Sequence, residues 1–241
     1  MKLFLINVGV NASHGTLKSP LFEDQTFQFV PIPEPASTQI YKEELTTYEK
    51  LFGNAAFIPR NKRMLCTHDD PEFTTLTYGD FPMRSGRAAL LRRAEIGDIL
   101  LFLARLVPWH GERFSGNPGF YLVGQLRVGQ IFKDIFVMPG EGALKEIKKN
   151  AHVKRSLADK SLFDGFWVFK GDGQSGLYEK AVPFTLDLAA SVLTDRHGEP
   201  WKTSDERTDL QVIGSYTRSC RIISDPAKVS LLLGEIEKWK K

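Results

Sequence analysis

Two long apolar runs in the middle of the chain constrain the fold more than any other feature. The run DILLFLARLVPW begins at Asp98, and the run GFYLVGQLRVGQIF begins at Gly119. Continuous apolar runs bounded by glycine and proline are typical of buried strands. The segment HGERFSGNPG between them is rich in glycine and polar residues, so we expect a long hairpin connection rather than a tight turn. The two runs therefore predict a β-hairpin.

Shorter segments on either side alternate between strand and helix patterns. We expect further strands over Lys2–Val8 and in TFQFVPIPEP, FDGFWVFKGD and GLYEKAVPF. Polar loop is expected from the end of the first helix to about Tyr78. The expected helices are Lys42–Phe52, SGRAALLRRAEIGD with Ser85 as its cap, Gly142–Lys149, TLDLAASVL and Ala227–Lys240. Because regular βαβ alternation is missing, the pattern predicts an α+β fold with a curved or barrel-like mixed β-sheet and flanking helices.

Length and charge set the wider limits. A chain of 241 residues can form one large domain or two small ones. We expect a single domain over 1–241 with a helical C-terminal segment over 186–241; an independent second domain after about Lys160 is the alternative. The net charge is only +3, so any affinity for nucleic acid has to come from local basic patches.

The cysteines and the lengths of the apolar runs indicate the cellular compartment of the protein. The two cysteines, Cys66 and Cys220, have no CxxC spacing, which favours a reducing compartment. The N-terminal apolar run is shorter than a signal peptide requires, and no run approaches the length of a membrane span. We therefore expect a cytoplasmic protein with no membrane segment.

The first candidate site is the polar loop after the N-terminal strand. Gly9 and Gly15 would let a ligand approach the backbone closely, and Asn11 and Ser13 offer hydrogen-bond donors and acceptors. His14 adds a group that can titrate near neutral pH. The spacing lacks the GxGxxG or Walker pattern of a phosphate-binding loop. Taken alone, the residues favour a simple turn, with a binding loop as the alternative.

The second candidate is the segment CTHDDPEFTTLTYGD. It gathers four ionisable groups within five positions and two more shortly afterwards: His68, Asp69, Asp70, Glu72, Tyr78 and Asp80. Carboxylates beside an imidazole could bind a divalent metal or act as an acid–base pair, whereas Asp before Pro is also common in turns. No spaced zinc signature is present, which excludes a zinc deaminase. We assign no metal ligand and leave the cofactor open.

Three other segments could contact phosphates or bases. Trp109 and Arg113 in the hairpin loop could stack on an unpaired base and hold its phosphate. His152 follows a lysine-rich stretch, and Lys170 precedes a glycine-rich loop that could form an anion nest. Solvated loops and a solvated helix face explain the same residues without a function.

In this order and spacing, the residues resemble the third of the numbered nucleotide-modification-associated domain families, whose members are associated with DNA base hypermodification. The similarity runs over about residues 2–185. Its landmarks are Gly9, Asn11, Ser13, Gly15, Ser19, Pro20, Asp24, Pro31, Ile32, Pro33, His68, Asp70, Pro71, Thr77, Tyr78, Asp80, His152 and the segment SGLYEKAVP. The two central strands are also similar, at the level of fold, to the PUA, ASCH and EVE-like barrels, so a PUA-like sheet is an expectation.

The resemblance implies nucleotide or base modification, with nucleotide or nucleic acid and proteins of a DNA-modification system as partners. The residues expected to act in catalysis are His68, Asp70, Tyr78 and Asp80. Those expected to bind substrate are Asn11, Ser13, His14, Trp109, Arg113, His152 and Lys170. The alternative is a non-catalytic reader of modified or flipped bases that uses Trp109, Phe114 and Tyr121. A structural partner in a modification or defence complex is the third hypothesis.

Overall fold

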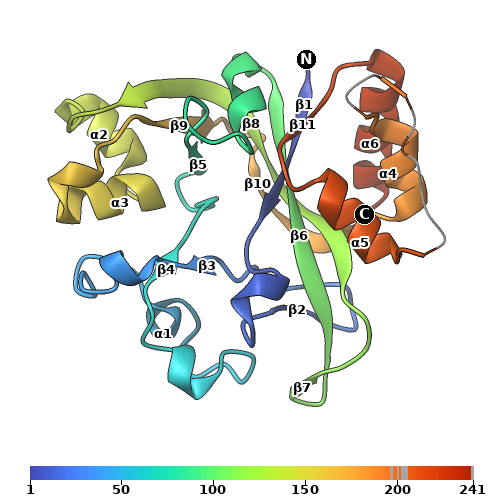
Figure 1. Cartoon of the computed structure of the whole chain (residues 1–241), viewed down its shortest axis with the longest axis horizontal. Helices are drawn as coiled ribbons and strands as arrows, with labels where there is room; N and C mark the ends of the chain where they lie inside the picture. Colours follow the sequence, from blue (N-terminus) through green and yellow to red (C-terminus); the bar gives the residue numbers. More distant parts are fainter. Residues whose placement is uncertain (196–197, 200, 202–205, 240–241) are drawn as a thin grey trace.

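The two central apolar runs form the longest strands of the protein. In the computed structural model, which describes residues 1–195, 198–199, 201 and 206–239, strands β6 (Ile99–His110) and β8 (Gly119–Ile135) pair antiparallel (Figure 1). Leu100 lies opposite Leu126, and Leu106 lies opposite Gly119. The predicted hairpin is therefore confirmed, and a two-residue strand, β7 (Arg113–Phe114), pairs with the end of β6 inside the connecting loop.

Around this hairpin the chain builds one mixed sheet. The path runs β11-β1-β6-β8-β9-β5, with β10 on β8 and with β2 and β7 on β6. Strand β1 is parallel to β6 and antiparallel to β11. A separate pair is formed by β3 and β4. The remaining strands are β1 (Leu3–Val8), β2 (Ser19–Leu21), β3 (Ile32–Pro33), β4 (Thr67–His68), β5 (Thr77–Asp80), β9 (Phe166–Gly171), β10 (Gly176–Pro183) and β11 (Arg221–Ile223).

The first half of β6 is buried on both faces of the sheet, which explains why it is a continuous apolar run rather than an alternating one. On β6, Phe102 packs into one core cluster and Leu101 into another, and both are fully buried. Helices cover the face of the sheet on which Leu101 lies, at the right of Figure 1. The helices are α1 (Tyr48–Phe52), α2 (Glu141–Ile147), α3 (Ala151–Ala158), α4 (Leu186–Val192), α5 (Asp209–Tyr216) and α6 (Pro226–Trp239).

The α+β class with a large mixed sheet and flanking helices is confirmed. The sheet does not close into a barrel among the described strands, because its path ends at β11 on one side and at β5 on the other. The barrel-like and PUA-like parts of the prediction are therefore not confirmed. The expected helix over Ala227–Lys240 is observed as α6, except that Lys240 lies outside the described residues.

Three local predictions need correction. The segment SGRAALLRRAEIGD forms a 3-10 turn over Ala89–Arg93 instead of an α-helix. Its buried residues, Ala88, Leu91 and Ala94, recur every three positions, which is the period of a 3-10 helix. The helix expected from Lys42 begins only at Tyr48, where the Thr47 side chain caps it.

The third correction concerns TFQFVPIPEP. It forms only the two-residue strand β3 and an isolated bridge from Phe27, since its prolines cannot donate to a ladder. The polar loop expected to about Tyr78 contains the short strand β4 and ends where β5 begins, at Thr77.

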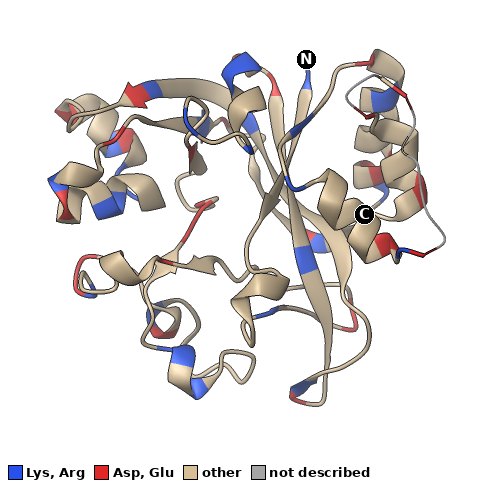
Figure 2. Ribbon diagram, viewed as in Figure 1, with Lys and Arg blue, Asp and Glu red and all other residues tan. Residues whose placement is uncertain are grey.

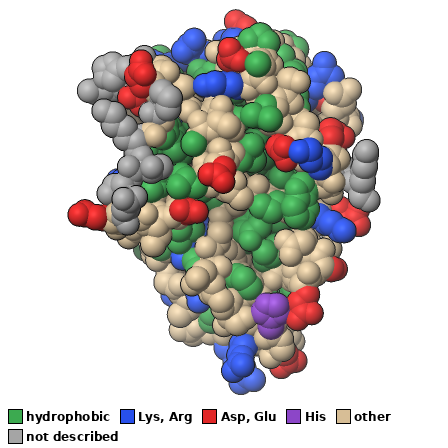
Figure 3. All heavy atoms as spheres, turned by 90° about the vertical axis from the view of Figure 1, so that its right-hand side faces the viewer, with side chains coloured by type: hydrophobic (Ala, Val, Ile, Leu, Met, Phe, Trp, Pro, Cys, Tyr) green, Lys and Arg blue, Asp and Glu red, His purple; other side chains and the backbone are tan. Residues whose placement is uncertain are grey.

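The surface is mixed in charge and polarity. In the view of Figure 2, basic and acidic residues are interspersed along the ribbon. The face over α4 and α6 likewise mixes hydrophobic, polar and charged side chains (Figure 3). Within the described part of the chain, none of the helices is both long and apolar enough to cross a membrane.

Candidate functional site

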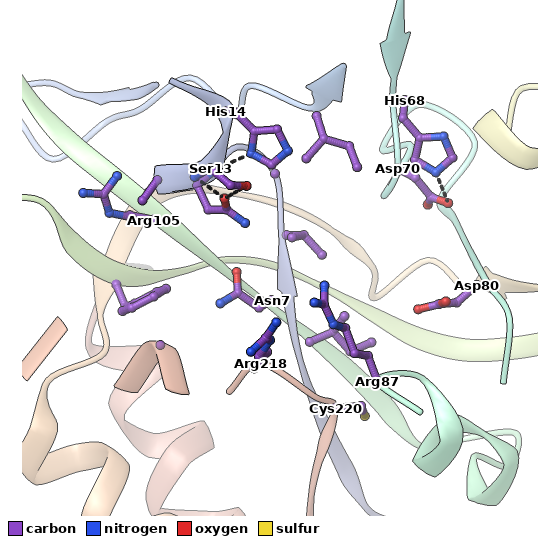
Figure 4. A pocket seen from close by; sticks show the side chains of 18 of the residues that line it. Asn7, Ser13, His14, His68, Asp70, Asp80, Arg87, Arg105, Arg218 and Cys220 are labelled. Atoms are coloured by element: carbon purple, nitrogen blue, oxygen red, sulfur yellow. Dashed lines mark hydrogen bonds and ion pairs between the residues drawn. The ribbon is translucent and has the colours of Figure 1, made fainter. Parts of the chain in front are cut away.

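A pocket with a volume of about 860 Å³ opens beside the carboxyl end of β1 (Figure 4). Its wall combines residues from distant parts of the chain: the turn after β1, the segment around β4 and β5, the loop near Ser85, β6, and α5 with the loop that follows it. The sheet therefore gathers polar groups that are far apart in sequence around one hollow.

The turn after β1 forms one part of the wall. Gly9 has a φ of +72°, and a Cβ there would lie 2.7 Å from the Phe29 ring, so only glycine suits this position. Asn11 then caps a 3-10 turn, since its Oδ1 accepts from the Ser13 N–H at 2.9 Å and its own N–H donates to His14 Nδ1 at 3.0 Å. Asn11, Ser13 and His14 thus serve as a cap and also line the pocket.

His68 lies on another part of the wall, and the side of its ring that faces away from the pocket contacts Glu34. The Nδ1 atom of His68 lies 2.8 Å from Oε1 of Glu34, whose side chain is fully buried. The other carboxylate oxygen accepts from the Thr38 hydroxyl at 3.1 Å. Burial raises the pKa of Glu34, but the hydrogen bonds from His68 and Thr38, together with the positive charges of Arg155 and of His68 when it is protonated, outweigh it, so the net shift of the pKa is downward.

Asp70 lies on the same part of the wall, and its side chain is almost completely buried. Its two oxygens accept from the backbone N–H of Gly79 at 2.8 and 3.1 Å, and Asn150 lies 3.4 Å away. Burial raises the pKa of Asp70 well above its usual value, although the Gly79 N–H opposes the shift. Next to it, the Tyr78 hydroxyl donates to Asp80 Oδ2 at 2.7 Å, and burial raises the pKa of both groups.

His152 completes the cluster from α3. Its Nε2 atom lies 3.5 Å from Asp70 Oδ2, and its ring stands perpendicular to that of His68 with the centroids 4.6 Å apart. On the far side, a guanidinium nitrogen of Arg155 lies 3.0 Å from His152 Nδ1. Burial lowers the pKa of His152 well below its usual value, so the ring is neutral.

One ligand atom from each of His68, Asp70 and His152 lies within 4.8 Å of the other two, which is close enough to surround a metal ion. The contact with Arg155 opposes this use. A guanidinium can only donate, so His152 Nδ1 accepts and the proton of the neutral ring sits on Nε2. His152 then carries an N–H, rather than a lone pair, at Nε2, the atom that lies 3.5 Å from Asp70 Oδ2. We therefore assign no metal to the cluster.

Three arginines that sequence reasoning missed line the rest of the pocket: Arg87, Arg105 and Arg218. In the part of the chain that the structure describes, their side chains make no hydrogen bond or ion pair, and Nε of Arg105 is buried without a partner. Burial also lowers the pKa of Arg105. An arginine inside the apolar run DILLFLARLVPW was the signal that could have identified it.

Most of the predicted site residues meet in this pocket. Those that line it are Asn11, Ser13, His14, His68, Asp70, Tyr78, Asp80 and His152. Three do not: Trp109 packs against Phe114 with the ring centroids 4.7 Å apart, Arg113 is exposed on β7, and Lys170 pairs with Glu146 at 3.0 Å. The hairpin loop therefore does not join the other two polar segments.

The chain also matches a known protein family over most of its length. A model of nucleotide modification associated domain 3 matches residues 2–216. The chain belongs to this family. Membership implies a role in nucleotide modification and extends the resemblance beyond the 2–185 expected. The matched range holds every residue that lines the pocket except Arg218 and Cys220. Neither a curated protein nor a solved structure matches the chain.

Proposed function

We propose that the pocket binds a nucleotide and is the place where its base or sugar is modified. The phosphate would lie near the arginines, and the nucleoside would face His68 and Asp70. The observation that carries this proposal is that arginines without a partner among the described residues share one pocket with a buried carboxylate–imidazole cluster; Figure 4 shows Arg105 at the left, Arg87 and Arg218 near the lower centre, and His68 with Asp70 at the upper right.

The arginines suit a phosphate because a guanidinium offers several donors in a plane that matches phosphate oxygens. A buried polar N–H without a partner is rare in folded proteins, and Nε of Arg105 is such a group. An anionic ligand would pair with the guanidinium groups of the pocket arginines, which have no partner among the described residues. Since the net charge of the chain is only +3, the arginines of the pocket, rather than a general positive field, would supply the affinity.

The opposite side suits chemistry on the nucleoside. Buried carboxyls with raised pKa values lie beside two imidazoles, and such perturbed groups gather at functional sites more often than elsewhere. A reader of flipped bases would instead need aromatic side chains on which the base can stack. Trp109 and Phe114 pack against each other outside the pocket, and the two aromatic rings that line it, Tyr78 and Phe120, are both buried, so these contacts favour modification over reading.

The test compares deoxynucleoside monophosphates with the corresponding nucleosides in isothermal titration calorimetry. We expect the monophosphates to bind at least about tenfold more tightly, because hydrogen bonds to a charged group are worth about 1.5–3 kcal/mol. Equal affinity for the two, or no binding of either, would refute a phosphate subsite. Asp70→Asn should keep this affinity, since the amide preserves the shape of the side chain.

Turnover is tested separately, by mass spectrometry of nucleosides digested from the DNA of cells that express the wild type or Asp70→Asn. New modified nucleosides should depend on Asp70. Modified nucleosides that form equally with Asp70→Asn would remove this residue from the proposed chemistry.

A further inference from the structure

We infer that Glu34 and His68 act as a general-base pair aimed into the pocket, a role that rests on the proposed function and makes it more specific. Glu34 lies outside the pocket lining and outside the polar segments of the sequence. Its carboxylate would hold His68 in one tautomer and stabilise the positive ring that forms when His68 takes a proton. The acceptor atom is Nε2 of His68.

The backbone fixes this pair firmly. Strands β3 and β4 place Ile32 opposite His68, and the Glu34 N–H donates to the carbonyl of Cys66 at 2.9 Å. The amide side chain of Gln39 ties the same two segments together, since it donates to the Glu34 carbonyl at 2.8 Å and accepts from the Cys66 N–H at 2.8 Å. Glu34 directly follows β3 and His68 lies on β4, so hydrogen bonds between these two backbone segments hold both residues in place.

The hydrogen bond determines where the proton of His68 lies. A carboxylate can only accept, so Nδ1 of His68 donates to Glu34 and the neutral ring keeps a lone pair on Nε2. This atom lies 3.9 Å from Asp70 Oδ2, too far for a hydrogen bond. The side chain keeps 12% exposure on the pocket wall. The lone pair is thus available to a ligand.

The neighbouring His152 has the opposite arrangement. Its Nδ1 accepts from Arg155, so its proton faces Asp70 and it cannot act as a base toward the pocket. Two histidines in van der Waals range thus carry different tautomers because one contacts a carboxylate and the other a guanidinium. This difference assigns the base to His68 and leaves His152 to position Asp70.

The step is a proton transfer. The proton of a hydroxyl or amino group on the nucleoside leaves for Nε2 of His68, and the electron pair of the broken bond stays on the oxygen or nitrogen. The ring becomes an imidazolium, which the ionised Glu34 stabilises. The substrate class is a nucleotide whose sugar hydroxyl, base hydroxyl or exocyclic amine reaches His68 while its phosphate lies near the arginines.

Long-range ¹H–¹⁵N spectra of histidine-labelled protein test the tautomers directly. The chain has five histidines, of which four lie among the described residues. We expect a proton on Nδ1 for His68, and a proton on Nε2 for both His14 and His152, whose Nδ1 atoms accept hydrogen bonds. A His68 ring with its proton on Nε2 would overturn the proposal without any substitution being made.

A chemical probe then tests the role of Glu34. Diethyl pyrocarbonate acylates histidine at the free nitrogen, and peptide mass spectrometry separates the sites. In Glu34→Gln we expect the rate at His68 to fall about tenfold, because a hydrogen bond to a charged partner is lost. An unchanged rate would contradict the pair. The matched control is Glu23→Gln, whose partner His110 makes the same contact at 2.7 Å but on the surface, with Glu23 78% exposed. There the rate at His68 should not change.

Two outcomes separate this proposal from the one on which it rests. If deoxynucleoside monophosphates fail to protect His68 while its tautomer is as expected, the nucleotide function fails and the pair stands. If they bind but His68 carries its proton on Nε2, the function stands and the pair fails. Metal analysis gives a further outcome. If the wild type binds stoichiometric zinc or manganese and both His68→Gln and His152→Gln fail to bind it, the cluster is a metal centre and the general-base role is overturned.

Discussion

Nε2 of His152 lies 3.5 Å from Oδ2 of Asp70, and both side chains are almost completely buried although they come from distant segments. The contact depends on Gly79 of β5. A Cβ at that position would lie 2.5 Å from the His152 ring and 3.0 Å from Asp70 Oδ2. The absence of one methyl group thus allows the strand, the aspartate and the histidine to meet.

Gly79→Ala should therefore disturb both stability and the cluster. We expect the free energy of unfolding to fall by about 1–3 kcal/mol, which is typical when atoms are forced into a packed site. Urea denaturation measures this change. Gly86→Ala is the matched control, since a Cβ there meets nothing within 4 Å. Equal effects of the two substitutions would show that Gly79 is not needed for close packing.

Asp69 gives the protein a pH-dependent stability. Burial raises its pKa to about 6, with Glu72 adding to the shift and with Lys154 and His68 opposing it. A carboxyl whose pKa is higher in the folded state than the unfolded value of about 3.9 favours folding while protonated. The folded state therefore loses stability as the pH rises from about 4 through 6.

Asp69→Asn should remove the loss of folding stability that the wild type shows as the pH rises. Relative to the wild type, the variant should be equally stable near pH 4 and more stable by about 1–3 kcal/mol at pH 7, given about 1.4 kcal/mol for each unit of pKa. Urea titrations at several pH values provide the measurement. A stability difference that stays constant from pH 4 to pH 7 would mean that the Asp69 carboxyl does not have the raised pKa.

The sequence predicted the parts of the fold that depend on local patterns. The hairpin of β6 and β8 and the strand β1 follow from continuous apolar runs, which need no knowledge of distant contacts. The helix predicted near Leu91 failed because an apolar spacing of three residues suits a 3-10 turn and only approximates an α-helix. Local patterns thus located this element but gave it the wrong type.

The residues of the site likewise fall into those that the sequence could predict and those that it could not. His68, Asp70, Tyr78 and Asp80 were predicted because they are close in sequence. Glu34 and Arg105 could not be found by that route, since Glu34 gains its role only when β3 pairs with β4, and Arg105 only when β6 lies beside the turn after β1. Trp109 was predicted for its residue type, and the strand pairing places it elsewhere.

Trp109→Ala distinguishes the pocket from the hairpin as the binding site. Trp109 packs against Phe57 and Phe114, so its loss should lower the free energy of unfolding by about 2 kcal/mol. The affinity of the folded protein for a deoxynucleoside monophosphate should stay the same, because the side chain does not line the pocket. Calorimetry below the unfolding temperature measures this affinity. A variant that folds but no longer binds would favour the reader of flipped bases.

Arg105→Gln tests the phosphate side of the pocket. Because Nε of Arg105 is buried without a partner, its removal should leave the free energy of unfolding unchanged or raise it. The affinity for a monophosphate should fall at least about tenfold, whereas the affinity for the nucleoside should not change. Arg127→Gln is the matched control, since Arg127 already binds Gln174 at 2.8 Å outside the pocket. If both variants weakened binding equally, the effect would come from overall charge, and the phosphate would not lie at Arg105.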